Sequence, residues 1–355
     1  MFNPKRLVLA RMRRRLTCKA LAEKSGLAAD TITRLELGKH DPDKETVSLL
    51  SIALGYPVEF FSANDPADIS VDAVSFRSFS RMSARERDAA IAAGSLGLDL
   101  FEWAEDKFSL PKPNLLDLSY EHDPILAAST LRQHWGIGDR PIGNVIGLLE
   151  VNGVRVLSLS ENTASVNAFS FWRDNKPYIF LNNFKSAESS VFDLGHELGH
   201  LLMHRKGDPK KLANCEREAD SFAAYFLMPK NDVKSRIHGN VSVESILLSK
   251  KRWKTSAMAL AFHLKSLNII SESRYRSICM ELSKRGYRRS ELYGIEREKS
   301  VVWKKIFDQL WSERVTKNDV AKALLVPVDE LEGLVWNLAG ESTPSVKEFK
   351  ALSLV

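Results

Sequence analysis

Cysteine is scarce in this 355-residue chain, and the few that occur do not cluster. They are Cys18, Cys215 and Cys279, and no two of them have C-x-x-C spacing. The spacing excludes a disulfide framework and a zinc site built from cysteines alone. Widely separated thiols are typical of proteins from a reducing compartment, so we expect a cytoplasmic protein.

Long apolar runs are missing as well. No stretch of about eighteen apolar residues occurs, so we expect no transmembrane span and no membrane partner. Near the N-terminus, Arg11 and the run Arg13–Arg15 interrupt the apolar residues, which excludes the core of a signal peptide. The remaining composition, 44% hydrophobic and 27% charged, is ordinary for a globular protein. A chain of this length predicts two or three domains.

Basic residues exceed acidic ones and are unevenly distributed. The formal net charge is +6. Residues 1–40 contain ten Lys or Arg against three Asp or Glu, and residues 250–314 contain sixteen against seven. A basic N-terminal region is typical of proteins that contact a polyanion, although a solvated basic face would give the same count.

The first 55 residues have the spacing of a helix-turn-helix domain. Ala22 is small, as is needed where two helices cross closely, and Gly26 makes the turn four residues later. Ile32 and Leu35 would then pack the recognition helix onto its partner helix. Thr17 is suited to cap the second helix. The predicted helices span about 3–15, 18–25, 28–37 and 45–54.

The run from Thr17 to Pro42, TCKALAEKSGLAADTITRLELGKHDP, resembles the Cro/phage-repressor (XRE) helix-turn-helix family. In that family the start of the third helix enters the major groove of double-stranded DNA. The alternative is a helix-turn-helix fold that serves only for dimerisation or for contact with a protein. The resemblance implies five DNA contacts, three to base edges and two to phosphates: Ala29, Asp30, Thr33, Arg34 and Lys39.

The rest of the chain is predicted to be mostly helical with a small sheet. From about residue 62 to residue 75 the chain is made largely of Asp, Ala, Pro, Asn and other residues typical of a linker, and we predict a linker over 63–80. Helical patterns follow over about 84–107 and 124–135, and again from residue 186 onward. We therefore predict an α+β fold that is mostly α. Short apolar or aromatic segments between turn residues predict the strands: 154–160, 168–172 and 178–181.

The run His196-Glu197-Leu198-Gly199-His200 has the H-E-x-x-H spacing of zinc hydrolases. Residues four apart lie on one face of a helix, so both imidazoles can reach one zinc ion at about 2.0–2.1 Å. Glu197 lies beside them and is suited to take a proton from a zinc-bound water. Gly195 and Gly199 are costly in a helix, which predicts that another backbone packs tightly there. The alternative is an ordinary helix with two surface histidines.

A hydrolytic zinc site needs a third protein ligand, and the segment CEREAD that follows is the best source. On a helix Glu216 and Asp220 share a face, whereas Glu218 lies about 200° from Glu216. We expect Glu216 to be the ligand and Asp220 to contact a zinc-bound histidine. Glu218 as the ligand, or a solvated acidic face, are the alternatives. His204 lies two turns beyond His196, so we expect it to support the site or to be structural.

Two stretches resemble the ImmA/IrrE family of metallo-endopeptidases. They are YIFLNNFKSAESSVFDLGHELGHLLMH at 178–204 and EREADSFAAYFLMP at 216–229. The resemblance extends over about 76–289 and implies a zincin-like domain. It also implies the roles inferred above for the H-E-x-x-H run and for Glu216. The sequence departs from the family pattern at Ser189-Ser190, where an Arg is usual.

These features predict four segments and one function. We expect a helix-turn-helix domain over 1–62, a linker over 63–80, a metallopeptidase domain over 81–290 and a helical extension over 291–355. We expect a homodimer that binds double-stranded DNA and uses Zn²⁺ to cleave a specific regulatory protein, such as a repressor or an antitoxin. The alternative is a transcriptional regulator whose peptidase-like domain senses metal, ligand or stress without proteolysis. Such a regulator could also be the antitoxin of a toxin–antitoxin pair.

Overall fold

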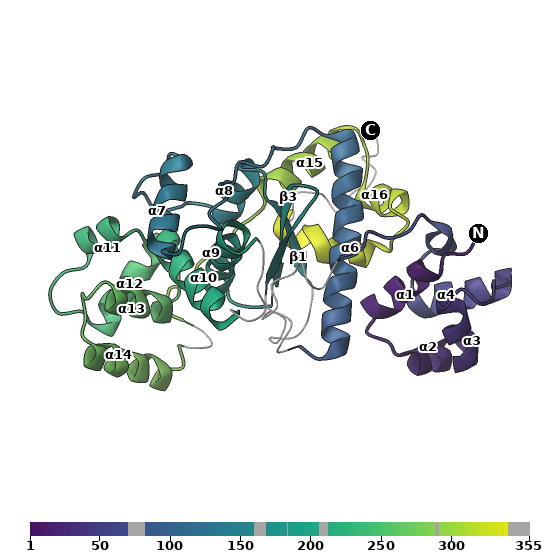
Figure 1. Cartoon of the computed structure of the whole chain (residues 1–355), viewed down its shortest axis with the longest axis horizontal. Coiled ribbons are helices and arrows are strands. Elements are labelled where there is room, and N and C mark those ends of the chain that lie inside the picture. The colour runs from purple at the N-terminus through teal and green to yellow at the C-terminus, as the bar shows by residue number, and fades with distance from the viewer. Residues whose placement is uncertain (70–81, 160–167, 183, 206–211, 288–290, 340–355) are drawn as a thin grey trace, which may run out of the picture. The chain divides into compact units, whose positions relative to one another are not determined.

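The computed structural model describes the chain apart from residues 70–81, 160–167, 183, 206–211, 288–290 and 340–355 (Figure 1). The chain divides into two units. One contains residues 1–69, 83–110 and 299–355, and the other contains residues 70–82 and 111–298. Of the predicted linker, residues 70–80 lie outside the described part. No helix in the described part is long and apolar enough to cross a bilayer.

The N-terminal helices of the first unit form as predicted, with ends that differ by at most two residues. Thr17 accepts a backbone N–H at the start of α2, and Gly26, with φ +74°, ends it. Leu21 of α2 and the α3 residues Ile32 and Leu35 are fully buried and join the two helices. The elements are α1 (Pro4–Arg13), α2 (Cys18–Ser25), α3 (Ala29–Glu36), α4 (Lys44–Leu54) and the 3-10 helix η1 (Val58–Ser62).

The first unit also contains helices from distant parts of the chain. Phe101 of α6 packs against Trp303 of α15, with ring centroids 5.0 Å apart. Glu330 of α17 is buried and accepts hydrogen bonds from Arg13 and Tyr56 at 2.7 and 3.1 Å. These elements are α6 (Ala84–Lys107), α15 (Val301–Ser312), α16 (Lys317–Ala323), α17 (Val328–Leu331), the π-helical turn η4 (Glu332–Trp336) and α18 (Asn337–Ala339).

Several basic residues of the N-terminal region pair with carboxylates inside this unit. Arg6 donates to Asp99 at 2.8 Å, and Arg13 donates to Glu330. Further pairs of the same kind join Lys5 to Asp65, Arg11 to Glu36 and Arg14 to Asp329. At least five of the ten basic residues counted in 1–40 therefore pair with carboxylates of the same unit, and the charge surplus is weaker support for polyanion binding than the count suggested.

The second unit is built around a three-stranded sheet with the order β1-β3-β2. β1 (Arg155–Leu159) runs parallel to β3 (Lys176–Asn182), and β2 (Phe169–Arg173) runs antiparallel to it. Asp174 and Asn175, both with positive φ, make the two-residue hairpin turn between β2 and β3. The three predicted strands and the mostly helical α+β class are confirmed, except that residue 160 of the first predicted strand lies outside the described part.

Successive side chains of β2 point to opposite sides of the sheet, and those on one side contact α9 (Ala187–Met203). Phe169 and Phe171 lie on one side of β2 and stack on neighbouring aromatic rings of the sheet. Ser170 and Trp172 lie on the other side and contact α9, where the Trp172 indole N–H donates to the Leu201 carbonyl at 2.8 Å. The remaining helices are α7 (Pro124–His134), α8 (Val145–Val151), α10 (Leu212–Leu227), α11 (Lys230–Arg236), α12 (Val243–Trp253), α13 (Ala257–Ser266) and α14 (Glu272–Lys284).

Gly195 and Gly199 let α9 and α10 cross closely. A Cβ on Gly195 would lie 3.2 Å from the Cβ of Ala223, and one on Gly199 would lie 3.1 Å from Phe222 and 3.3 Å from the Cα of Ala219. The tight backbone packing predicted from the two glycines is therefore present. It brings the middle of α10 against the part of α9 that carries the H-E-x-x-H run.

Candidate metal centre and recognition helix

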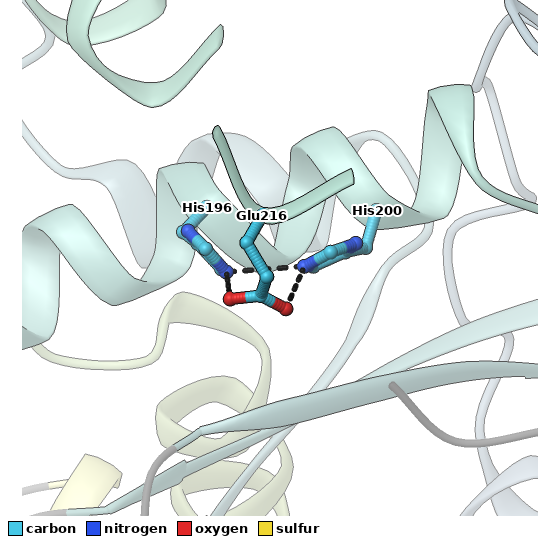
Figure 2. Close-up of side chains that lie close together, drawn as sticks. All are labelled: His196, His200 and Glu216. Atoms are coloured by element: carbon cyan, nitrogen blue, oxygen red, sulfur yellow. Dashed lines mark hydrogen bonds and ion pairs between the residues drawn. The ribbon is translucent and has the colours of Figure 1, made fainter. Parts of the chain in front are cut away.

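Three side chains from α9 and α10 converge on one point (Figure 2). The Nε2 atoms of His196 and His200 lie 3.0 Å apart. The carboxylate oxygens of Glu216 lie 3.5 Å from the Nε2 of His196 and 3.4 Å from the Nε2 of His200. All three side chains are at least four-fifths buried.

This donor set fits a zinc ion. Ligands at about 2.0–2.1 Å from a tetrahedral ion lie roughly 3.4 Å from one another, close to the separations in this cluster. Two imidazoles and one carboxylate are the three protein ligands typical of a hydrolytic zinc site, which keeps a further position open. The described residues thus include a complete set of three donors for such an ion.

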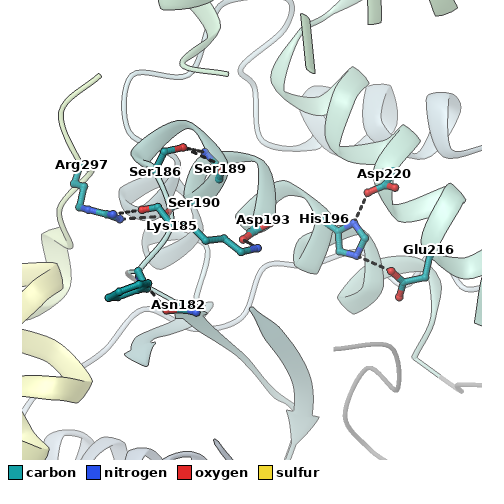
Figure 3. Close-up of polar contacts among 11 residues, drawn as sticks. Asn182, Lys185, Ser186, Ser189, Ser190, Asp193, His196, Glu216, Asp220 and Arg297 are labelled. Atoms are coloured by element: carbon teal, nitrogen blue, oxygen red, sulfur yellow. Dashed lines mark hydrogen bonds and ion pairs between the residues drawn. The ribbon is translucent and has the colours of Figure 1, made fainter. Parts of the chain in front are cut away.

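The outer nitrogens of both histidines are held by other side chains. The Nδ1–H of His196 donates to Asp220 at 2.8 Å, and Figure 3 shows Asp220 and Glu216 reaching this ring from α10. The Nδ1 of His200 lies 3.0 Å from the Nδ1 of His204, whose Nε2 lies 2.9 Å from Glu218. Each inner Nε2 is therefore free of an outward hydrogen bond and directed at the centre of the cluster.

Glu197 lies on the sheet side of α9 and not among the three donors. Its side chain is almost fully buried, and the Ser170 hydroxyl of β2 donates to its Oε2 at 2.7 Å. Burial raises the pKa of Glu197 to about 7, against the opposing effects of His196 and Ser170. A carboxyl with a pKa in this range is suited to both accept and return a proton near neutrality.

The pKa values of the two histidines are shifted in opposite directions. Burial lowers the pKa of His196, but its hydrogen bonds to Asp220 and Glu216 outweigh this effect and raise the pKa to about 10. Burial lowers the pKa of His200 to about 4, so this ring is neutral at pH 7. Burial opposes ionisation of Glu216, yet its contacts with both histidines hold its pKa well below the usual range. A carboxylate and at least one neutral imidazole, both competent ligands, therefore face each other at neutral pH.

The five predicted DNA contacts are all exposed, four of them on α3 and the fifth just after it. Ala29, Asp30 and Thr33 lie on the outer side of α3, opposite the buried Ile32 and Leu35. The hydroxyl of Thr33 donates back to the Ala29 carbonyl at 3.0 Å. Arg34 lies 3.6 Å from Asp30, an exposed pair that contributes little stability. Lys39 follows the helix and is exposed.

Two family models match the chain. Residues 8–61 match a model described as a helix-turn-helix, and residues 149–265 match one described as an IrrE N-terminal-like domain, in a peptidase family. The second match contains the sheet, α9 and α10. The predicted fusion of an XRE-type helix-turn-helix with an ImmA/IrrE-like peptidase domain is confirmed. No curated protein gives a significant match. The chain is thus a helix-turn-helix protein with a metallopeptidase-like domain.

Sequence reasoning missed Ser170 and Arg297. Ser170 contacts Glu197 only because β2 packs against α9, and nothing local in the sequence signals this contact. Arg297 donates to Ser190 at 3.2 Å and to the carbonyl of Lys185 (Figure 3). A guanidinium therefore reaches α9 beside Ser189-Ser190, the position where the related family usually carries an Arg. The one hint in the sequence was that Ser189-Ser190 replace this Arg.

Proposed function

We propose that this chain is a DNA-binding zinc metallo-endopeptidase that cleaves a specific regulatory protein, such as a repressor or an antitoxin. The observation that carries the proposal is the convergence of His196, His200 and Glu216 beside the buried Glu197. A helix-turn-helix domain in the same chain makes a regulatory substrate more fitting than bulk protein, because it would bring the peptidase to regulated DNA.

Each residue has a role in the proposed reaction. His196, His200 and Glu216 would hold the zinc ion, which when bound supplies Lewis acidity toward a water molecule and a peptide carbonyl. Glu197 accepts the proton of the attacking water and returns it to the leaving amine. Ser170 holds the Glu197 carboxylate in place by its hydrogen bond. Asp220 fixes the ring orientation of His196.

DNA binding is proposed for the exposed side of α3. Ala29, Asp30 and Thr33 would face base edges, while Arg34 and Lys39 would neutralise phosphates. A homodimer would present two such helices to a two-fold symmetric operator. Exposure of all five residues supports this assignment.

The variant Glu197→Gln tests the proposed reaction. We expect it to abolish cleavage, because the amide cannot accept the proton, and to leave zinc and DNA binding nearly unchanged. The measurement is proteomic comparison of cells that express the wild type or the variant, followed by cleavage of the identified protein in vitro with and without a chelator. Undiminished cleavage by Glu197→Gln would rule out this mechanism. If zinc changes DNA affinity and no product forms, the chain is instead a metal-responsive regulator.

A further inference from the structure

A second set of metal-binding side chains lies next to the first. His204, Cys215 and Glu218 each offer one donor atom, and these atoms all lie within 4.8 Å of one another. His204 follows the end of α9, while Cys215 and Glu218 are three residues apart on α10 and so lie on one face. All three are of intermediate burial, and the side chains of His204 and Glu218 are 11% and 35% exposed. The set combines an imidazole, a thiol and a carboxylate.

The two sets are joined by a hydrogen bond between His200 and His204. Their Nδ1 atoms lie 3.0 Å apart, and this bond accommodates a single hydrogen. When the Nε2 of a neutral His200 binds a metal, its hydrogen is on Nδ1 and is donated to His204. The Nδ1 of His204 then accepts, and its own hydrogen is on Nε2, which donates to Glu218 at 2.9 Å. In this state the Nε2 of His204 has no lone pair for a metal.

The opposite arrangement disables the first set. A metal bound by the Nε2 of His204 places the hydrogen of that ring on Nδ1, which donates to the Nδ1 of His200. The hydrogen of His200 must then be on its Nε2, the atom that faces His196 and Glu216. Each occupied set therefore favours the tautomer that weakens the other.

We propose that His204, Cys215 and Glu218 form a second metal site, for a thiophilic divalent ion such as Zn²⁺, which competes with the first site. The thiolate selects zinc over magnesium or calcium, which prefer oxygen ligands. On binding, the ion replaces the thiol proton of Cys215, which is released to solvent. Excess zinc would thus fill a site that disfavours the ligand form of His200. This inference concerns metal binding and holds whether or not the chain cleaves protein.

Cobalt titration of the full-length, reduced, zinc-free chain tests the proposal. Co²⁺ is a spectroscopic substitute for Zn²⁺, and only a cobalt ion bound by a thiolate gives an intense near-ultraviolet charge-transfer absorption. We expect this absorption in the wild type and its loss in Cys215→Ser. The matched control is Cys279→Ser, which alters another partly exposed thiol of the same unit and should retain the absorption.

Two further variants test the ligands of the second site and its competition with the first. Glu218→Gln keeps the thiol but removes a ligand, and should shift the absorption to about tenfold or more higher cobalt concentrations. His196→Ala removes a ligand of the first set, so the thiolate absorption should appear at about tenfold lower cobalt. Circular dichroism verifies that each variant is folded.

Three results would overturn the proposal. The second site is absent if no thiolate absorption appears at saturating cobalt in the folded, reduced wild type. It is wrongly assigned if the absorption survives in Cys215→Ser and disappears in Cys279→Ser. The competition is refuted if His196→Ala and the wild type develop the absorption at the same cobalt concentration.

Discussion

At the scale of single residues, the contacts around the two histidines decide how well the centre can hold a metal. Asp220 is half exposed, yet its hydrogen bond fixes which nitrogen of His196 carries the hydrogen. A ring that is free to rotate or to change tautomer presents its lone pair to the cluster for only part of the time. The supporting carboxylate therefore matters for affinity, although it is not itself a donor to the ion.

Removing the Asp220 carboxylate should weaken metal binding. We expect Asp220→Ala to lower zinc affinity about tenfold to a hundredfold, because His196 loses the acceptor for its Nδ1–H. Competition with a fluorescent zinc chelator measures the affinity. Asp174→Ala, in the exposed hairpin turn, is the control and should leave it unchanged. Equal affinity of the two variants would mean that Asp220 does not support the ligand.

His263 makes the second unit sensitive to acid. It is fully buried, its Nε2–H donates to the Met228 carbonyl at 2.8 Å, and burial lowers its pKa to about 4. Between pH 6.5 and 4 the unfolded chain binds a proton at this residue and the folded chain does not. The contribution of His263 is therefore complete above pH 6.5 and is lost as the pH falls toward 4.

The expected loss is roughly 3 kcal/mol across this window, at about 1.4 kcal/mol for each pKa unit. Urea unfolding of the zinc-free chain at several pH values measures it. The control is His263→Gln, whose amide can still donate to Met228 but does not titrate, so its stability should fall less steeply. Identical slopes for the two proteins would exclude His263 as the source.

At the scale of elements, the crossing of α9 and α10 assembles the centre. Gly199→Ala should gain about 1 kcal/mol in helix propensity but lose about 1–3 kcal/mol by overpacking against Phe222 and Ala219. The added Cβ also pushes the helices apart, so zinc affinity should fall together with stability. Urea midpoints and zinc competition measure the two effects.

Gly143→Ala is the matched control for the crossing. A Cβ at Gly143 meets no atom within 4 Å, so its effect on stability should stay within about 0.5 kcal/mol. If Gly199→Ala behaves like this control, the close approach of the helices does not depend on the glycine.

The sequence predicted those parts of the centre that depend on local helical spacing. His196, His200 and Glu197 are related by one turn of one helix, and Gly195 and Gly199 indicated the close neighbour. Contacts between elements could not be predicted in this way, because they depend on the packing of the sheet. Ser170, which contacts α9 from β2, is such a case. The link from His200 through His204 to Glu218 likewise needs the observed crossing of α9 and α10.

At the scale of the whole molecule, the helix α1 and the helix α17, which lies more than 300 residues later, belong to one unit. Arg13 and Glu330 are 317 positions apart in the sequence, yet they are paired at 2.7 Å. Arg14 and Tyr56 contact the same carboxylate, which is only 2% exposed. No local pattern predicts a pair at this separation. The helix-turn-helix domain is therefore supported by a helix that lies far outside its own segment.

Replacing Glu330 should destabilise the DNA-binding unit and leave the metal centre intact. Glu330→Gln removes the buried carboxylate that Arg13 and Arg14 share, and breaking a buried pair of this kind costs about 3–5 kcal/mol. The control is Glu332→Gln, which removes a 40% exposed partner of Lys317 and should cost about 1 kcal/mol or less. Thermal unfolding and DNA affinity should both fall for Glu330→Gln, while zinc affinity stays at the wild-type value. If the DNA affinity and thermal unfolding of Glu330→Gln match those of the control, α17 does not support the helix-turn-helix domain. If zinc affinity falls together with DNA affinity, the metal centre depends on this unit.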